Sequence, residues 1–563
     1  LEGEYLMQTN KEERVLNYYG ICNKLKDVIR TGWKTWNVKR ERLESVAEHV
    51  YGVQMLAIAM KSEYEYDVDI MKVIFMLAIH ELGEAVIGDL TQFDISKEDK
   101  ERIEHEAVSK ILRGILDGKE IENLFLEFDS HSTKESMFAY MCDKLECDLQ
   151  CKLYDEEGCV DLNKQDGNNT LNNKIVHDLL ALGSSWSEMW LKFGQQIYPY
   201  DDNFRSISSY AIAHKLEEKS INILIVEDDD YKYNNIVRDL KDINENLAIF
   251  RLNNCMDALA YFRTLKNSDK KYDLLITDNY MPLRSDTFDL SPYGSYIINT
   301  FRNKVSKETP ICICPSDEFD DVCDYNYFAL YEPTKSLQED FTKIIGDINS
   351  KNNNLKEEKV LKYYILCNKL KNIIRTGWKK CGVKRERLES VAEHIYGVQM
   401  LAIAMKSEYG YDIDIMKVIF MLAIHELGET VIGDYDENDI SKREKERKEH
   451  EAVHIILKDI LNGEIIEKLF LEFDSHSTKE SMFAYMCDKL EGDLQCKLYD
   501  EEGCVDLSDL EGKHFRNPHR VAKLHSQGIS WSQIWMQNSL NSYPYDDNFR
   551  SLSNYAQKHK IKK

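Results

Sequence analysis

Four side chains that can bind a metal ion occur in the same order in each half of the chain. In the first half, a histidine in AEH, an adjacent His-Glu pair in LAIHELGE and an aspartate in MCDKLE interrupt helical patterns that are otherwise apolar. An unpaired charge buried in such a pattern would cost several kcal/mol, and a bound cation removes that cost. Two imidazoles and two carboxylates suit a divalent metal that keeps positions open for water and substrate. The predicted ligands are His49, His80, Glu81 and Asp143, and then His394, His425, Glu426 and Asp488.

The ligands recur because a long block of sequence occurs twice, 345 residues apart. Residues 38–88 and 383–433 differ at four of 51 positions, and residues 124–162 and 469–507 differ at one of 39. A repeat of about 200 residues is far longer than the roughly 20 to 50 residues of a solenoid unit. We therefore predict a duplicated domain, with a different segment between the copies. The predicted domains are residues 11–215, 219–350 and 356–560.

Helices must position the predicted ligands. ESVAEHVYGVQMLAIAMKSEY and DIMKVIFMLAIHELGEAVIG carry apolar residues at i, i+3, i+4 and i+7, the pattern of an amphipathic helix. A lone histidine in such a helix is more often a satisfied core residue, so the prediction depends on the whole set. Neighbouring residues of a helix point about 100° apart, so His80 and Glu81 can bind one metal only where several helices converge. Each copy is therefore predicted to be an all-α bundle.

The segment between the copies has a different pattern. Short apolar runs such as INILIV, NLAIFRL, YDLLIT and ICIC alternate with helical patterns such as YKYNNIVRDLKDI. This alternation is typical of βα units around a parallel sheet. The sequence thus predicts a multidomain protein in which a doubly wound α/β domain separates two all-α bundles.

Bulk composition limits the classes of partner. A chain of 563 residues exceeds one core, and its formal charge of −26 argues against a nucleic acid polymer, which needs a basic surface. The first residues show no basic region followed by an apolar one, so we expect no signal peptide, and no apolar run is long enough for a membrane span. The 14 cysteines without close CxxC pairs suggest a reducing compartment. We expect a cytoplasmic protein.

The motif order RTGW, ESVAEHVYGVQMLA, HELGEAVIGDL and CDKLE resembles the HD-domain phosphohydrolases, in particular the branch that contains the 5′-deoxynucleotidases. The resemblance covers about 200 residues in each copy. It implies a helical bundle around one divalent metal per copy, which we expect to be Mn, Co, Fe, Zn or Mg. Glu81 and Glu426 stand where the family has the Asp of its defining doublet, and glutamate offers the same carboxylate on one more methylene group.

The resemblance also implies roles for other residues. In the family, the acid three residues after the doublet and the Asp of the GD pair lie at the reaction centre, where a carboxylate orients water or accepts its proton. Basic side chains neutralise charge on the phosphoryl oxygens, although solvated helix charges are the alternative for these arginines. The predicted catalytic residues are Glu84, Asp89, Glu429 and Asp434. The predicted substrate-binding residues are Arg30, Trp33, Arg42, Arg375, Trp378 and Arg387, with Arg40 as a further candidate.

One feature of the sequence predicts a functional difference between the copies, and another raises the alternative of a second metal ion. The loop after the GD pair reads GDLTQFDIS in one copy and GDYDENDIS in the other, so the two sites are predicted to differ in rate or specificity. His105 and His131 recur as His450 and His476, and a second metal is the minority alternative.

INILIVEDD and YDLLITDNYMP resemble the response-regulator receiver domain, which takes phosphate on an Asp after its third strand. By this resemblance Asp278 is the acceptor, and Glu227 and Asp228 would hold Mg²⁺. Three neighbouring carboxylates would repel one another without a cation. However, ICICPS replaces the family's Ser/Thr position, and Glu332 stands where the family has Lys and would repel a phosphoryl group. We predict a degenerate receiver that holds and spaces the HD domains, with a phosphorylation switch as the alternative.

The predicted function is metal-dependent hydrolysis of a nucleotide phosphomonoester, of the 5′-deoxynucleotidase type. The alternatives are hydrolysis of another nucleotide, such as a triphosphate or an alarmone, and a nucleotide-binding signalling module whose receiver serves protein pairing. The expected partner is a small nucleotide, with no nucleic acid polymer and no membrane. We expect the two HD copies to pack as a pseudo-twofold pair within one chain, and a homo-oligomer is a further expectation.

Overall fold

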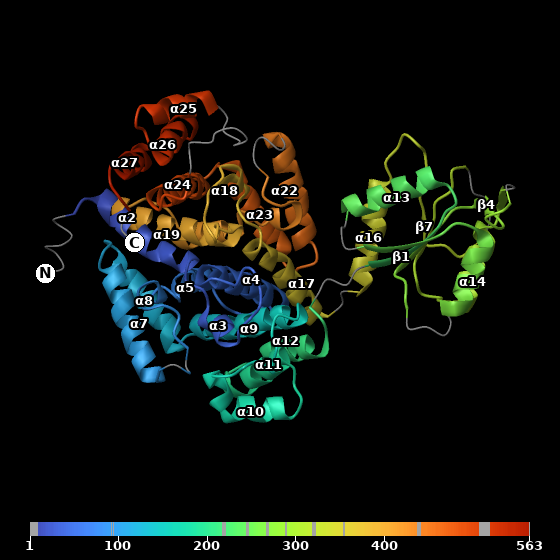
Figure 1. Ribbon diagram of the computed structural model, residues 1–563, viewed down its shortest axis with the longest axis horizontal. Coiled ribbons are helices and arrows are strands. Elements are labelled where there is room, and N and C mark those ends of the chain that lie inside the picture. The colour runs from blue at the N-terminus through green and yellow to red at the C-terminus, as the bar shows by residue number, and fades with distance from the viewer. Residues whose placement is uncertain are drawn as a thin grey trace. The chain divides into compact units, whose positions relative to one another are not determined.

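The computed structural model of the chain separates into two compact units (Figure 1). Unit 1 combines residues 1–216 with residues 356–563, and unit 2 comprises residues 217–355. Within the described part of the chain, no helix is both long and apolar enough to cross a membrane. The structure describes residues 9–91, 93, 95–216, 221–243, 247–265, 270–287, 290–317, 323–352, 355–435, 441–505 and 518–561.

Unit 1 is built from helices, and the two repeated sequences form the same succession of them. The first copy contains α2 (Lys11–Cys22), α3 (Thr31–Thr35), α4 (Val46–Tyr64), α5 (Ile70–Ile79), α6 (Glu84–Ile87), α7 (Lys97–Leu112), α8 (Gly118–Ser130), α9 (Lys134–Glu156), α10 (Lys174–Ala181), α11 (Trp186–Ile197) and α12 (Asp202–Ala213). The second contains α17 (Lys356–Asn368), α18 (Thr376–Lys380), α19 (Val391–Tyr409), α20 (Ile415–Ile424), α21 (Glu429–Ile432), α22 (Lys442–Leu457), α23 (Gly463–Ser475), α24 (Lys479–Glu501), α25 (Pro518–Ser526), α26 (Trp531–Ser542) and α27 (Asp547–Ala556).

The start of α4 is fixed by a reciprocal cap just before the first predicted ligand. The Ser45 hydroxyl accepts a hydrogen bond from the Glu48 backbone N–H at 3.2 Å, and the Glu48 carboxylate accepts one from the Ser45 N–H at 2.8 Å. These bonds satisfy amides that the start of a helix leaves without partners. His49 is consequently held by a regular helix instead of a loop. Ser390 and Glu393 cap α19 in the same way.

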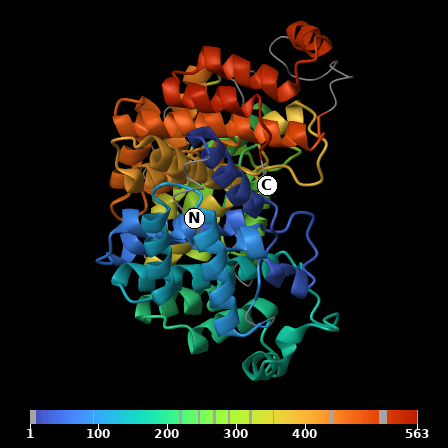
Figure 2. The same ribbon diagram turned by 90° about the vertical axis from the view of Figure 1, so that its left-hand side faces the viewer.

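The two copies do not form separate bundles, because each gives its first helix to the other. Helix α2 packs against α19 and α27, and α17 packs against α4 and α12. Figure 2 shows helices of the first copy, in blue to green, alongside those of the second, in orange to red. One continuous apolar core contains side chains from both copies. The two copies, which are separate along the chain, therefore form one shared unit in space.

The two copies are related by a pseudo-twofold axis. Gln54 and Gln399 occupy equivalent places in the repeat, and the side-chain amide of each donates to the other, at 3.3 and 3.2 Å. Because equivalent residues contact each other in this reciprocal way, the axis passes between them. The packing of the HD copies within one chain agrees with the arrangement expected from the duplication.

Unit 2 is an α/β domain with a five-stranded parallel sheet in the order β2-β1-β3-β6-β7. One face is covered by α13 and α16 and the other by α14 and α15, so the domain is doubly wound. A short antiparallel pair, β4 and β5, lies outside this sheet. The strands are β1 (Ile221–Val226), β2 (Leu247–Leu252), β3 (Leu274–Thr277), β4 (Tyr280–Pro282), β5 (Leu290–Pro292), β6 (Ile311–Ile313) and β7 (Tyr327–Phe328), and the helices are α13 (Asp230–Ile243), α14 (Cys255–Leu265), α15 (Gly294–Lys304) and α16 (Gln338–Asn352).

Candidate metal centre

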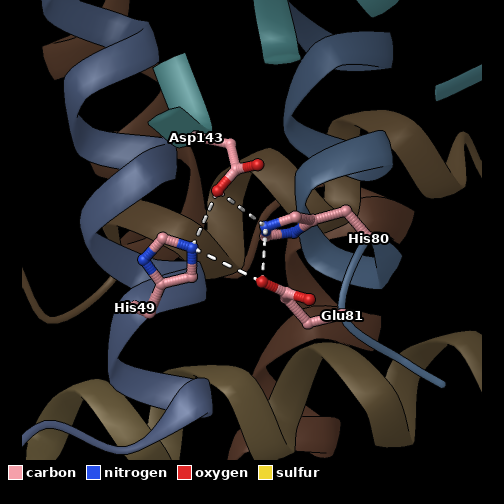
Figure 3. Close-up of side chains that lie close together, drawn as sticks. All are labelled: His49, His80, Glu81 and Asp143. Carbon is pink, nitrogen blue, oxygen red and sulfur yellow. Dashed lines mark hydrogen bonds and ion pairs between the residues drawn. The ribbon is translucent and has the colours of Figure 1, made fainter. Parts of the chain in front are cut away.

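The structure brings the four predicted ligands of each copy together. His49 comes from α4, His80 and Glu81 follow α5, and Asp143 comes from α9 (Figure 3). In each copy the candidate ligand atoms lie within 4.8 Å of one another. His49 Nε2 is 3.1 Å from Asp143 Oδ1 and 3.7 Å from Glu81 Oε1, and His80 Nε2 is 3.7 Å from the same Glu81 oxygen. The second copy repeats this arrangement with His394, His425, Glu426 and Asp488.

The doublet lies where helix α5 ends. Helix α5 ends at Ile79, His80 is its C-cap, and a turn containing Glu81 leads into α6. The sequence pattern predicted a continuous helix through this region, which would have pointed the two side chains about 100° apart. The structure has a turn here instead, and both side chains point into the same space between helices (Figure 3).

Both imidazoles aim Nε2 at the cluster, because other groups hold Nδ1. The Nδ1–H of His80 donates to the backbone carbonyl of Leu77 at 2.7 Å, and that of His49 donates to Glu146 Oε2 at 2.6 Å. The buried Nε2 of His80 has no hydrogen-bond partner among the described residues. Bonds of this kind fix the tautomer and orientation of metal-binding histidines. The donor set therefore fits a divalent cation, which would take the lone pair that the protein leaves unused.

The charges around the cluster favour a cation. Burial alone would raise the pKa of Glu81, but positive charge beside it, including that of Arg30, lowers the pKa to about 2, so this carboxylate is ionised. Burial lowers the pKa of His80 and keeps that imidazole neutral, which is the form that binds metals. Burial also opposes a proton on His49, yet Glu146 and Asp143 raise its pKa to about 9. The same anionic surroundings would hold a metal ion in place of that proton.

Glu84 is a buried carboxyl group beside the cluster. It is 1 % exposed, and neither carboxylate oxygen has a hydrogen-bond partner within the described part of the chain. Burial, followed by the charges of Glu81 and Asp89, raises the pKa of Glu84 well above its usual range. Lys100 on α7 places its Nζ 3.8 Å from Glu84 Oε1. In the second copy Lys445 approaches Glu429 to 3.0 Å. Neither lysine was among the predicted site residues.

Arg30 and Asp89 lie at the edge of the cluster. Arg30 Nη1 is 2.9 Å from Glu81 Oε1, and the corresponding distance from Arg375 to Glu426 is 3.4 Å. Although burial opposes it, the charges of Asp89 and Glu81 raise the pKa of Arg30 further. The Asp89 carboxylate accepts a hydrogen bond from the backbone N–H of Thr31, and the Thr31 hydroxyl donates to the Asp89 carbonyl at 2.6 Å. Asp434 and Thr376 repeat these bonds.

The family model for the HD domain matches this chain twice, at residues 22–180 and 367–523. The chain belongs to the HD-domain family. It is similar to the 5′-deoxynucleotidase HDDC2 of Dictyostelium discoideum, with 35% identity over 150 residues that cover 25% of this chain and 78% of that protein. HDDC2 of Danio rerio is 32% identical over 26% of this chain and 71% of its own length. The 5′-deoxynucleotidase hdd1 of Schizosaccharomyces pombe is 29% identical over 27% of this chain and 77% of its own length.

Arg42 and Arg387 have a different place from the one predicted. Arg42 Nη2 lies 2.8 Å from both Glu48 and Glu393, and Arg387 Nη2 lies 2.8 Å from Glu48 and 2.7 Å from Glu393. The four residues form a charge network between the two HD copies. Their predicted substrate contacts are replaced by this interface role, because all four charges are already paired with one another.

Trp33 and Trp378 also serve the protein interior. Trp33 Nε1 donates to Glu44 Oε2 at 3.0 Å, and its ring packs edge-on against Tyr154 and Trp186. Trp378 donates to Glu389 in the same way at 2.8 Å. Both indoles are 4 % exposed, so they act as core residues instead of a substrate platform. Arg40, the further candidate, pairs with Glu157 at 2.7 Å and with Asn372 of the other copy at 2.9 Å.

Two further predictions can be located in the HD copies. His105 pairs with Asp129 at 2.7 Å and the ring of His131 lies 3.8 Å from that of Tyr140, so neither histidine is among the four clustered ligands. Their counterparts His450 and His476 have the same surroundings. The loop that differs between copies, at residues 90–96 and 435–441, lies partly outside the described residues.

The acidic residues of unit 2 gather as predicted, but a lysine accompanies them. Glu227, Asp228 and Asp278 follow β1 and β3, which are neighbouring parallel strands, and their carboxylates lie close together. Lys232 on α13 is 3 % exposed, and its Nζ is 3.0 Å from Glu227 and 2.9 Å from Asp278. Burial raises the pKa of Glu227 to about 7. The negative charge of Asp278 adds to this effect, and the positive charge of Lys232 opposes it. Lys232 was not among the residues predicted for this pocket.

Proposed function

We propose that each HD copy is a metal-dependent phosphohydrolase that removes the 5′-phosphate of a deoxynucleoside monophosphate. The observation that carries the proposal is the buried His-His-Glu-Asp cluster, in which the Nε2 of His80 has no hydrogen-bond partner among the described residues. The 5′-deoxynucleotidase relatives support this substrate class. His49, His80, Glu81 and Asp143 would hold one divalent ion in the first copy, and their equivalents would hold one in the second.

A divalent metal bound there would act as a Lewis acid and lower the pKa of water. The protein supplies the remaining functions. Arg30, beside Glu81, can pair with a phosphoryl oxygen and offset the charge that develops during hydrolysis. Glu84 is free of hydrogen bonds to described residues and can exchange a proton with water or with the leaving 5′-oxygen. Asp89 fixes Thr31 and so places Arg30, the preceding residue.

A phosphate-release screen tests the proposal. The protein is stripped of metal, reloaded with Mn²⁺, Co²⁺, Fe²⁺, Zn²⁺ or Mg²⁺, and incubated with deoxynucleoside monophosphates, the matching ribonucleotides, triphosphates and an alarmone. We expect inorganic phosphate from the deoxynucleoside monophosphates. Release only from a triphosphate or an alarmone would favour the runner-up hydrolase. Tight nucleotide binding without hydrolysis would favour the signalling module.

For unit 2, the proposal is a receiver-like domain that does not work as a phosphorylation switch. The order of its parallel strands and the acidic pocket support the resemblance. The Lys232 ammonium already pairs with Glu227 and Asp278, so the pocket has a cation of its own. Glu332 stands where the family has Lys and would repel a phosphoryl group, so it also disfavours a phosphorylation switch. A homo-oligomer of whole chains stays a prediction.

A further inference from the structure

We propose that each metal centre is positioned by a lysine of the opposite HD copy. Lys371, in the second copy, positions the ligand His49 of the first through Glu146. Lys26, in the first copy, positions His394 of the second through Glu491. The inference rests on the proposed metal-dependent function and adds two positioning residues that lie outside the ligand set.

The Lys371 ammonium group donates three hydrogen bonds, all to side chains of the first copy. Its Nζ lies 2.5 Å from Glu44 Oε1, 2.6 Å from Glu146 Oε1 and 3.1 Å from Gln150 Oε1. The other oxygen of Glu146 accepts the Nδ1–H of His49 at 2.6 Å. Lys371 therefore fixes the carboxylate that fixes the imidazole, and all three side chains are buried.

A tyrosine of the second copy supports the same carboxylate. The Tyr364 hydroxyl donates to Glu146 Oε1 at 2.8 Å, beside the Lys371 contact. One Glu146 oxygen thus receives two donors from the second copy, while the other faces His49. A buried carboxylate held in this way cannot turn away from the imidazole without losing charge-assisted hydrogen bonds.

The second centre has the reciprocal arrangement. Lys26 Nζ lies 2.5 Å from Glu389, 2.6 Å from Glu491 and 3.1 Å from Gln495. The Tyr19 hydroxyl donates to Glu491 Oε1 at 2.9 Å, and Glu491 Oε2 accepts from His394 Nδ1 at 2.6 Å. Each copy therefore supplies the lysine and the tyrosine that the other copy's centre uses.

A glycine in each ligand-bearing helix makes room for the lysine. Gly52 lies in α4, three residues after His49, and an added Cβ would be 2.5 Å from Lys371 Nζ and closer still to Glu146 Oε1. In α19, an added Cβ at Gly397 would be 2.6 Å from Lys26 Nζ and again closer to the carboxylate of Glu491. Glycine inside a helix costs roughly 0.5–1 kcal/mol relative to alanine. The helix accepts that cost where the lysine of the other copy passes.

Ordinary stabilisation of the interface accounts less well for this arrangement. Buried ion pairs are often no more stabilising than apolar side chains of similar size, because both charges lose their hydration. Here each of the two buried ion pairs, that of Lys371 and that of Lys26, also requires a glycine that weakens a helix. A role at the metal ligand explains why the charge is placed against Glu146 and Glu491. The ligands of each centre come from one copy, and the other copy supplies the groups that hold the carboxylate behind the histidine.

The test measures metal affinity at one centre at a time. In a His425→Ala background, the remaining centre is that of the first copy, and Mn²⁺ binding is measured by calorimetry. Lys371→Met, although it lies in the second copy, should weaken Mn²⁺ binding by about 10- to 100-fold, the usual range for loss of a group that orients a ligand. In a His80→Ala background, Lys26→Met should weaken the second centre similarly. Tyr364→Phe, a milder change, should weaken the first centre by a smaller factor and serves if Lys371→Met does not fold.

Arg14→Met is the matched control. Arg14 pairs with Glu408 of the other copy at 2.6 Å and both are buried, but this pair does not contact a ligand or its carboxylate partner. It should leave Mn²⁺ affinity unchanged. Unchanged affinity in folded Lys371→Met or Tyr364→Phe protein, or an equal loss in Arg14→Met, would overturn the inference. A parent protein that binds no divalent metal overturns it together with the proposed function. A parent that binds Mn²⁺ but hydrolyses no nucleotide refutes the proposed function alone.

Discussion

Replacing Gly52 by alanine should destabilise unit 1, although the same change inside a helix usually stabilises a protein. Removing the flexibility of glycine from the unfolded chain normally contributes about 0.4–1 kcal/mol. At Gly52 the new methyl group would lie 2.5 Å from Lys371 Nζ and closer to Glu146. Overpacking of this kind costs typically 1–3 kcal/mol, and separating the buried charges about 3–5 kcal/mol. Both costs together exceed the gain, so we expect a net loss of at least about 3 kcal/mol.

Gly492→Ala is the matched control for this prediction. Gly492 lies inside α24, where an added Cβ would meet no described atom within 4 Å, and the equivalent residue of the first copy is Cys147. This variant should be as stable as the parent protein or up to about 1 kcal/mol more stable. Urea unfolding of both variants, followed by circular dichroism, gives the comparison. If Gly52→Ala shifted the urea midpoint upward as Gly492→Ala does, the close approach of the lysine to α4 would be refuted.

Three further predictions concern the remaining groups. Glu84→Gln and Glu429→Gln should each leave partial phosphate release, because each removes the proton-exchanging acid of one centre. Together they should lower kcat by about 100-fold or more. A single variant as inactive as the double variant would show that only one copy works. Arg42→Met should lower the unfolding free energy by about 1–3 kcal/mol without changing KM for a nucleotide, because Glu48 and Glu393 would then share the single arginine Arg387. A raised KM at unchanged stability would restore the substrate role of Arg42. Treatment with acetyl phosphate and Mg²⁺ should leave the hydrolysis rate unchanged, and Lys232→Met should increase Mg²⁺ binding by unit 2. Two results together would contradict the degenerate receiver: stoichiometric phosphate labelling that Asp278→Ala abolishes, and a several-fold change in the hydrolysis rate.

The ligand set could be predicted from the sequence because its members break apolar patterns. His49, the His80–Glu81 doublet and Asp143 are conspicuous where only apolar side chains would otherwise fit. The α/β character of unit 2 was equally accessible, since alternating strand and helix patterns specify a parallel sheet. The repeat itself predicted that the two copies would have the same succession of helices.

Other features depend on contacts that no local pattern shows. The apolar period of the sequence continues past Ile79. The sequence therefore did not predict that α5 ends there and that a turn carries Glu81. Arg30 and Arg42 lie in similar basic stretches, but only the first reaches the cluster. Lys371 and Glu146 are 225 residues apart, and Lys371 stands in an ordinary polar stretch, NKLKN. The exchange of first helices, which brings these two together, is a property of the assembled unit.

Metal content measured beside phosphate release tests the central claim most directly. The parent protein should hold about two divalent ions per chain, one in each HD copy, and should release phosphate from deoxynucleoside monophosphates. The double variant His80→Ala/His425→Ala should lose nearly all of that metal and the activity with it, while remaining folded by circular dichroism. Unchanged metal content in this double variant, measured by elemental analysis after dialysis, would contradict the assignment of the two centres.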